Sequence, residues 1–200
     1  MKQPSAPADK TAGLHREIAA CELCKEHLPL GPRPIVQFSA RSRILIIGQA
    51  PGTKVHASGI AWDDDSGDRL REWLGVDKQT FYDPDAIALM PMGFCYPGKA
   101  KSGDAPPRKE CQPAWHDRVL SLLPGDRLTL LVGSYAQAHY LPGTRKMSLT
   151  QRVQSGGDFA PFIPLPHPSW RVRMWMAKNA WYEADVLPAL RRNVSAALRT

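Results

Sequence analysis

Four short apolar runs stand out along the chain because they show little alternation with polar residues. They span residues 44–47, 86–92, 128–132 and 162–165. Runs of this kind are typical of strands that are covered on both faces, as in a parallel sheet with helices on each side. The pattern therefore predicts an α/β fold with four mainly parallel strands, the last of which is weakened by its prolines.

Apolar residues at helical spacing occur between these runs. Leu70, Trp73 and Leu74 fall on one face of a helix that Asp65 or Ser66 could cap. The last helix should bend at Pro188, because proline interrupts the backbone hydrogen-bond ladder. Further helices are predicted over 14–21, 111–122, 134–141 and 172–198, with loops over 28–42, 53–60 and 98–108.

The length of 200 residues fits a single domain with a substantial core. Residues 1–12 are rich in Pro, Ala, Lys and Ser and are expected to form a flexible tail, so that the domain occupies 13–200. The formal net charge of +7 favours polyanionic partners, although a basic surface can also serve solubility alone. We expect a monomer.

The hydropathy of the chain gives no sign of a membrane partner. No apolar run approaches the roughly 20 residues that are needed to span a bilayer. Residues 1–10 are polar and lack the apolar core of a secretory signal. We therefore expect a cytoplasmic protein.

The first apolar run leads directly into a turn rich in glycine and proline, Gly48-Gln49-Ala50-Pro51-Gly52. Glycine lets a backbone approach a ligand closely, and open α/β sheets bind ligands at the carboxyl ends of their strands. This turn is therefore a candidate for the active site. The alternative is a tight strand-to-loop connection without chemistry.

The chain contains four cysteines, Cys21, Cys24, Cys95 and Cys111. Each lies in a predicted loop or at a helix end, where its thiolate could turn toward a common point. In a cytoplasmic protein, such cysteines are more often thiols or metal ligands than disulfides. Four thiolates would suit zinc or an iron–sulfur cluster, and four unrelated thiols remain the alternative.

A histidine between two prolines, in the segment 166–168, follows the last predicted strand. The stiff backbone fixes the direction of the His167 ring, and a fixed ring can donate a hydrogen bond to a developing anion. Trp170, Arg171 and Arg173 add an aromatic side chain and cations, the mixture that a nucleic-acid surface needs. A partly buried tryptophan beside solvated arginines is the alternative.

These residues carry a resemblance to a known family. The turn 48–52 resembles the first motif of the uracil-DNA glycosylase superfamily, and His167-Pro168-Ser169 resembles the second. The chain is similar to the iron–sulfur branch, the family 4 enzymes, whose first motif is typically Gly-Glu-Ala-Pro-Gly and whose four cysteines are spaced much like these. The resemblance runs from about Cys21 to the last helix.

The resemblance implies a three-layer α/β/α sandwich with a central, mainly parallel four-stranded sheet. It also implies a structural 4Fe-4S cluster on the four cysteines, with zinc as the alternative. The implied reaction breaks the bond between a damaged base and its sugar after the base has been flipped from the duplex into a pocket.

The resemblance further implies roles for individual residues. His167 is expected to stabilise negative charge on the base oxygen, and Gln49 takes the position of the motif glutamate. The residues expected around the flipped base are Ala50, Gly52, Trp62 and Phe94. The residues expected to contact DNA are Ser134, Ser169, Trp170, Arg171 and Arg173.

Two positions depart from the family pattern. Gln49 stands in place of the motif glutamate, and Ala50 stands where the best-known relatives carry a water-activating aspartate, so the first motif has no carboxylate. The Gln49 amide or one of the aspartates at 63–65 could orient water instead. Pro91 occupies about the position of an asparagine that reads the uracil edge, and proline offers no side-chain hydrogen bond.

We therefore expect a DNA repair glycosylase that excises uracil or a related deaminated base from DNA. One alternative is a non-catalytic nucleic-acid-binding or lesion-binding protein on the same fold, which the missing carboxylate would allow. A third interpretation is a zinc-stapled protein with an unrelated small-molecule site.

Overall fold

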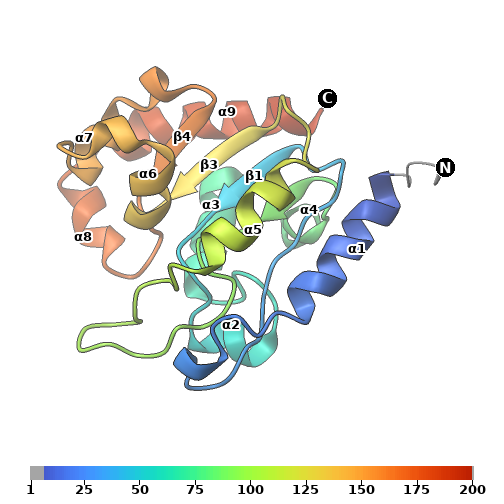
Figure 1. Cartoon of the computed structure of the whole chain (residues 1–200). Coiled ribbons are helices and arrows are strands. Elements are labelled where there is room, and N and C mark those ends of the chain that lie inside the picture. Colours follow the sequence, from blue (N-terminus) through green and yellow to red (C-terminus); the bar gives the residue numbers. More distant parts are fainter. Residues whose placement is uncertain (1–6, 200) are drawn as a thin grey trace.

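A four-stranded parallel sheet forms the centre of the protein, whose computed structural model describes residues 7–199 (Figure 1). The strands lie in the order β2-β1-β3-β4, and β1 pairs Ile44 with Ile87 on one side and with Leu128 on the other. All four apolar runs thus form strands, and the predicted parallel sheet is confirmed. The strands are β1 (Ile44–Ile47), β2 (Ile87–Leu89), β3 (Leu128–Val132) and β4 (Phe162–Leu165).

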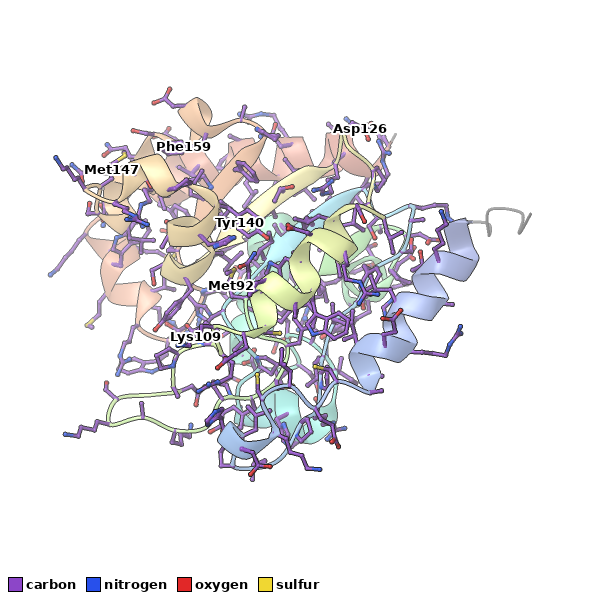
Figure 2. All side chains as sticks on the ribbon, in the orientation of Figure 1. Met92, Lys109, Asp126, Tyr140, Met147 and Phe159 are labelled. Carbon is purple, nitrogen blue, oxygen red and sulfur yellow. The ribbon has the colours of Figure 1, made fainter. Side chains whose placement is uncertain are left out.

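Both faces of the sheet are buried, because alternate residues of each strand point into two separate cores. In β1, Ile44 and Ile46 pack on one side, and Leu45 and Ile47 pack on the other. Side chains fill the space between the sheet and the helices on either face (Figure 2). One layer contains α3 (Asp65–Leu74), α4 (Lys78–Tyr82) and α9 (Leu187–Leu198), and the other contains α1 (Pro7–Ala19), α5 (Cys111–Leu120) and α6 (Ser134–Tyr140). The predicted three-layer α/β/α arrangement is confirmed.

Several helix boundaries differ from those predicted. Helix α1 begins at Pro7, inside the segment that was expected to be a tail. The segments 53–58, 78–82 and 149–154 form short helices that are too brief to show a helical period in the sequence. Other short elements are α2 (Thr53–Ser58), α7 (Leu149–Gln154) and the 3₁₀ turns Lys25–His27, Pro142–Thr144 and Gly156–Phe159. Within residues 7–199, no helix has both the length and the apolar character that a membrane span requires.

The predicted last helix is not continuous. Helix α8 (Val172–Ala177) is followed by its C-cap, Lys178, and a π-helical segment, Tyr182–Val186, then leads into α9. The π-helical turn directly precedes Pro188, whose missing N–H would leave a regular helical turn incomplete. The prediction of one helix with a bend at Pro188 is therefore wrong. Apolar residues of α8 and α9 pack against the same core, so their spacing in the sequence looks like that of one continuous helix.

The amino-terminal cap of α3 also differs from the prediction. Asp64 is the cap, and its side chain accepts a hydrogen bond from the Gly67 N–H at 2.9 Å. Asp65 lies inside the helix and forms an ion pair with Lys54 at 3.1 Å. The correct cap precedes both predicted residues, which shows that a run of three aspartates leaves the first helical turn ambiguous.

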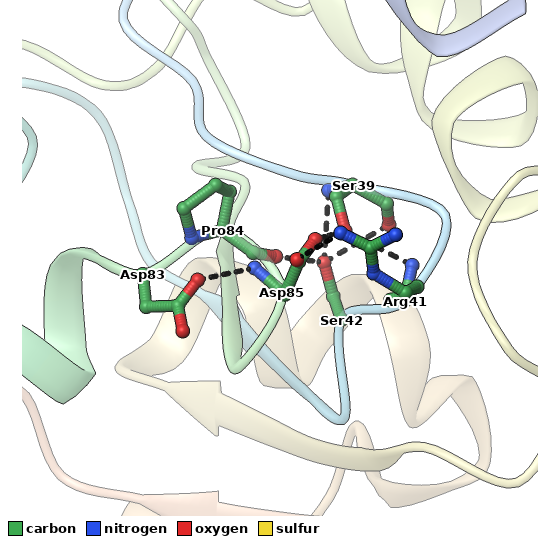
Figure 3. A network of polar contacts seen from close by, with 6 residues as sticks. All are labelled: Ser39, Arg41, Ser42, Asp83, Pro84 and Asp85. Atoms are coloured by element: carbon green, nitrogen blue, oxygen red, sulfur yellow. Dashed lines mark hydrogen bonds and ion pairs between the residues drawn. The ribbon is translucent and has the colours of Figure 1, made fainter. Parts of the chain in front are cut away.

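A polar network joins the segments that precede β1 and β2 (Figure 3). Asp85 accepts a hydrogen bond from the Ser39 hydroxyl at 2.5 Å and forms an ion pair with Arg41. The Ser42 hydroxyl donates to the Pro84 carbonyl at 2.7 Å. The network therefore holds the amino ends of the two strands in register, at the edge of the sheet away from their carboxyl ends.

The two edges of the sheet have different neighbours. On the β2 side, Gln37 pairs with Leu89 through an isolated antiparallel bridge, with N···O distances of 3.0 and 2.7 Å. On the β4 side, Leu165 directs its carbonyl inward to the Gly133 N–H at 2.9 Å. Because successive residues of a strand direct their backbone groups to opposite sides, the preceding residue, Pro164, faces the free edge.

A buried histidine joins α5 and α6 to the loop after β2. The His116 Nδ1 lies 2.7 Å from the Tyr140 hydroxyl oxygen, and the Nε2 lies 3.1 Å from the Pro91 carbonyl oxygen. A carbonyl only accepts hydrogen bonds, so Nε2 carries the proton and Nδ1 accepts from Tyr140. Burial lowers the pKa of His116 to about 4, and the ring is therefore neutral at pH 7.

Protonation of His116 should destabilise the fold within a defined pH range. The pKa of His116 is about 4 in the folded protein and near 6.5 in the unfolded chain, so the unfolded state binds more protons between these values. The stability linked to His116 is complete above pH 6.5 and falls as the pH drops to 4, by on the order of 3 kcal/mol in total.

Urea denaturation at several pH values measures the free energy of unfolding of wild type and of His116→Gln. The slope of this free energy against pH, between pH 4 and 6.5, should be smaller in His116→Gln. His27→Gln changes an exposed histidine that is not among the groups that shift the pKa of His116, and it should keep the wild-type slope. Identical slopes for all three proteins would contradict the neutral, buried state of His116.

Candidate active site

A cavity of about 400 Å³ opens at the carboxyl edge of the sheet. It is lined by the turn 48–52 after β1, Pro91 after β2, His167 and residues 169–171 after β4, the residues that lead into α3, and residues 102–104. This volume lies within the usual range for small-molecule pockets. The loops after three parallel strands therefore meet at one cavity, where an α/β sheet commonly binds its ligand.

Most of the site residues that the sequence predicted lie together around this cavity. Those that line it are Gln49, Ala50, Gly52, Trp62, His167, Ser169, Trp170 and Arg171. Three others lie elsewhere. Ser134 is exposed at the start of α6, Arg173 lines a separate groove with Arg69 and Glu72, and Phe94 is buried beside the cysteines.

The indole of Trp62 packs between the end of β1 and His167. The two ring centroids are 5.7 Å apart, and the ring planes differ by 29°. A Cβ added to Gly48 would lie 2.8 Å from an indole carbon, closer than side-chain packing allows. Gly48 therefore lets the indole come close to the strand end, and the motif turn, Trp62 and His167 form one packed unit.

The backbone of Trp62 is held in an unusual conformation. Its φ of 58° lies in the left-handed region, which side chains other than glycine rarely adopt. A Cβ added to Gly67 would lie 1.7 Å from the Trp62 carbonyl oxygen, and Arg71 Nη1 donates to the same oxygen at 3.3 Å. The surrounding structure thus fixes a strained residue, as is common at functional sites.

His167 is held from two sides. A Cβ added to Gly133 would touch the His167 Cβ at 3.4 Å, and Arg69 Nη1 donates to the Pro168 carbonyl at 2.7 Å. Burial lowers the pKa of His167, and the negative charge of Asp64 partly offsets this effect. A neutral imidazole carries one N–H, so His167 can donate one hydrogen bond to a ligand in the cavity.

The motif turn is fixed through its backbone. The Gly48 carbonyl accepts a hydrogen bond from the Met92 N–H at 2.9 Å, and the Gln49 carbonyl accepts from the Gly93 N–H at 3.0 Å. The turn is thereby joined to the loop after β2. Because these contacts use only backbone atoms of Gln49, they leave its amide side chain available at the cavity.

An aromatic side chain and a cation lie together on the rim of the cavity. The Trp170 side chain is 68% exposed, which is unusual for such a large apolar group. The Arg171 guanidinium lies over the Trp170 ring, 5.0 Å from its centroid. The two side chains therefore form a flat, positively charged surface beside Ser169 and the cavity.

Two carboxylates, Asp64 and Asp104, also line the cavity. Asp64 belongs to the aspartate run considered above, whereas no feature of the sequence marks Asp104. It reaches the cavity because the segment 98–105 folds back as a hairpin, with Ala105 N–H donating to the Gly98 carbonyl at 2.8 Å. Sequence reasoning missed Asp104 because its position depends on this hairpin.

The four cysteines surround a second, separate cavity. Cys21, Cys24, Cys95 and Cys111 line it together with the apolar side chains of Leu23, Leu28, Phe94 and Trp115. All four are free thiols. Burial raises the pKa of Cys95 to about 11 and that of Cys111 to about 12, so both thiols are protonated near pH 7 in these surroundings.

The thiols do not converge on a single point. Within residues 7–199, no group of three or more His, Cys, Asp or Glu side chains is close enough together to hold one metal ion. A structural zinc ion needs four ligands around one centre, and each sulfur ligand lies about 2.3 Å from the metal. The cysteines instead share a cavity, and Phe94 joins its wall by donating its N–H to the Cys111 Sγ at 3.3 Å.

Gly67→Ala should destabilise the protein, although alanine normally favours a helix. The added methyl group would collide with the Trp62 carbonyl, so the turn that carries the indole must move. We expect the free energy of unfolding to fall by about 1–3 kcal/mol.

Gly13→Ala is the matched control, because Gly13 lies in α1 with nothing within 4 Å of its added Cβ. Its free energy of unfolding should rise by about 0.5–1 kcal/mol. Urea denaturation measures both changes, and a gain in both variants would contradict the packing described.

A comparison with protein families identifies the superfamily of this chain. The model of the Uracil DNA glycosylase superfamily matches residues 35–191, which is most of the chain. The matched region includes all four strands, the turn 48–52 and the segment 167–171, whereas Cys21 and Cys24 precede it. The sequence match and the cavity at the carboxyl ends of the strands lead to one conclusion. This chain belongs to the uracil DNA glycosylase superfamily.

Proposed function

We propose that the protein is a DNA glycosylase that removes uracil or a related deaminated base by hydrolysing the N-glycosidic bond. The observation that carries this proposal is that the Gln49 turn, Trp62 and His167 line one cavity of about 400 Å³. Enzymes of this kind must take a base out of the duplex and enclose it. An aromatic wall and a fixed hydrogen-bond donor are the groups that such a pocket needs.

His167 is suited to assist departure of the base. Cleavage of the N-glycosidic bond places negative charge on the leaving base and positive charge on the sugar. A donor that is already oriented stabilises this charge without reorganising as the reaction proceeds. Because burial lowers the pKa of His167, its ring donates as a neutral imidazole and does not have to be charged at pH 7.

The rim of the cavity is suited to hold DNA. An exposed aromatic ring such as Trp170 can stack on bases or fill the space that a flipped base leaves, and Arg171 can pair with a phosphate. The formal net charge of +7 adds a general attraction to nucleic acid. Trp170 and Arg171 are therefore the proposed DNA contacts next to the pocket.

A second function is favoured by one specific observation. The turn 48–52 contains no carboxylate, so the protein could bind a damaged base without cutting the bond. Incubation of the full chain with oligonucleotides that contain uracil, hypoxanthine or xanthine separates the two functions. Alkali-labile abasic sites indicate a glycosylase, whereas tight binding without such sites indicates a lesion-binding protein.

His167→Ala should reduce the rate of excision far more than the affinity for DNA. Loss of one oriented donor typically lowers the rate by about 10²–10³-fold, or roughly 3 kcal/mol. Single-turnover kinetics on the best substrate of the panel gives the rate, and fluorescence anisotropy gives the dissociation constant.

Two further variants make this test specific. His167→Gln keeps an N–H donor and should retain more activity than His167→Ala. His139→Ala removes an exposed histidine that lines neither cavity and should behave as the wild type. Parallel losses of rate and affinity in His167→Ala would count against the proposed role.

We further propose that the four cysteines hold a 4Fe-4S cluster, as in the iron–sulfur branch of the superfamily. The thiols supply the soft ligands that iron–sulfur clusters use, and all four line one cavity. The raised pKa values of Cys95 and Cys111 mean that binding would release protons. The residues would supply a structural link between the segment before β1 and the loop after β2.

Protein purified without oxygen should be brown and contain equal amounts of iron and acid-labile sulfide. Cys111→Ser should lose the colour and most of the iron, and its melting temperature should fall because the bound group no longer stabilises the folded state. Absorbance spectra, iron and sulfide assays and thermal denaturation measure these changes. A colourless protein with one bound zinc would refute the cluster.

A further inference from the structure

Hydrolysis of an N-glycosidic bond needs a group that orients water and stabilises the positive charge on the sugar. A carboxylate performs both tasks well, and none occurs in the turn 48–52. Among the residues that line the cavity, only Asp64 and Asp104 carry carboxylates. The two differ in what surrounds them and in which wall of the cavity they occupy.

Asp104 reaches the motif turn from a separate part of the chain. A Cβ added to Gly52 would lie 3.3 Å from the Asp104 Oδ2, so this oxygen is next to the turn that Gln49 and Ala50 also form. The neighbouring residues Ser102 and Gly103 line the same cavity. A carboxylate is therefore present at the motif turn although the motif itself supplies none.

The hairpin holds Asp104 in a definite position. Lys99 and Asp104 face each other through an antiparallel bridge, and the Ala100 N–H donates to the Gly103 carbonyl at 2.9 Å. Lys99 Nζ pairs with the Asp104 Oδ1 at 2.9 Å. The ion pair uses one carboxylate oxygen and leaves Oδ2, the oxygen beside Gly52, for another partner.

Asp64 is placed less suitably for the same task. Its Oδ1 accepts the hydrogen bond from the Gly67 N–H that caps α3. Its negative charge also acts on His167, where it partly offsets the lowering of the pKa by burial. A negative charge that acts on the proposed hydrogen-bond donor disfavours the negative charge that develops on the leaving base.

We propose that Asp104 is the carboxylate that orients and deprotonates the attacking water. The inference rests on the proposed glycosylase function. In the step, the water oxygen bonds to the sugar C1′ while the bond from C1′ to the base nitrogen breaks. The bonding electron pair leaves with the base, one water proton passes to the Asp104 carboxylate and then to solvent, and the base anion takes a proton from solvent.

Asp104→Asn in the full chain is the decisive variant, because the amide preserves size but cannot accept the proton. Its single-turnover excision rate should fall by about 10²-fold or more, and its dissociation constant for the same oligonucleotide should change by less than about 3-fold. Asp104→Ala should show the same loss, and added formate, a small carboxylate, should restore part of its rate.

Two control variants separate chemistry from structure. Lys99→Met removes the ion pair but keeps the carboxylate, so it should retain much more activity than Asp104→Asn. Asp158→Asn removes an exposed carboxylate that lines neither the cavity at the motif turn nor the cysteine cavity, and it should match the wild type. Circular dichroism melts check that each variant is folded.

Each outcome decides between the two proposals. An active wild type with Asp104→Asn within about 3-fold of its rate overturns the role of Asp104 and leaves the glycosylase function standing. A large loss in Asp64→Asn, which keeps a helix cap, with none in Asp104→Asn would assign the task to Asp64. A wild type that excises none of the three bases overturns the proposed function and the role of Asp104 together.

Discussion

Burial of β1 on both of its faces is the constraint on which the rest of the molecule depends. Ile44 to Ile47 are all 0% exposed, and their side chains alternate between the two cores that pack against the helical layers. Burial of each of these side chains contributes roughly 1.5–3 kcal/mol. A strand held this firmly delivers the turn 48–52 to a fixed place, and the loops after β2 and β4 are hydrogen-bonded or packed around it.

The site combines this rigid support with residues that are locally strained. Trp62 keeps a left-handed backbone because Gly67 leaves room for its carbonyl and Gly48 leaves room for its ring. The indole in turn stacks with His167. The cost of the unusual backbone, of order 1–3 kcal/mol, is offset by packing elsewhere, and the result is a cavity whose walls are positioned before any ligand arrives.

The sequence predicted features that depend on apolar runs and on short motifs. The four strands and the placement of Gln49 and His167 at one cavity follow from buried runs that end in glycine-rich or proline-rich turns, whereas the placement of Trp62 was implied by the family resemblance. Features that depend on tertiary contacts were not predictable in this way. The division of the last helix, the Asp64 cap and the position of Asp104 each result from packing or hydrogen bonds between distant segments.

The residues at the two edges of the sheet affect how readily copies of the chain associate. An exposed edge strand can recruit a strand from another molecule through unpaired backbone groups, and this is a common route to aggregation. Here the antiparallel bridge from Gln37 occupies part of the β2 edge, and Pro164 removes an outward N–H donor from β4. The sheet is thus a poor template for intermolecular strand addition at either end, which favours recovery of unaggregated protein after unfolding.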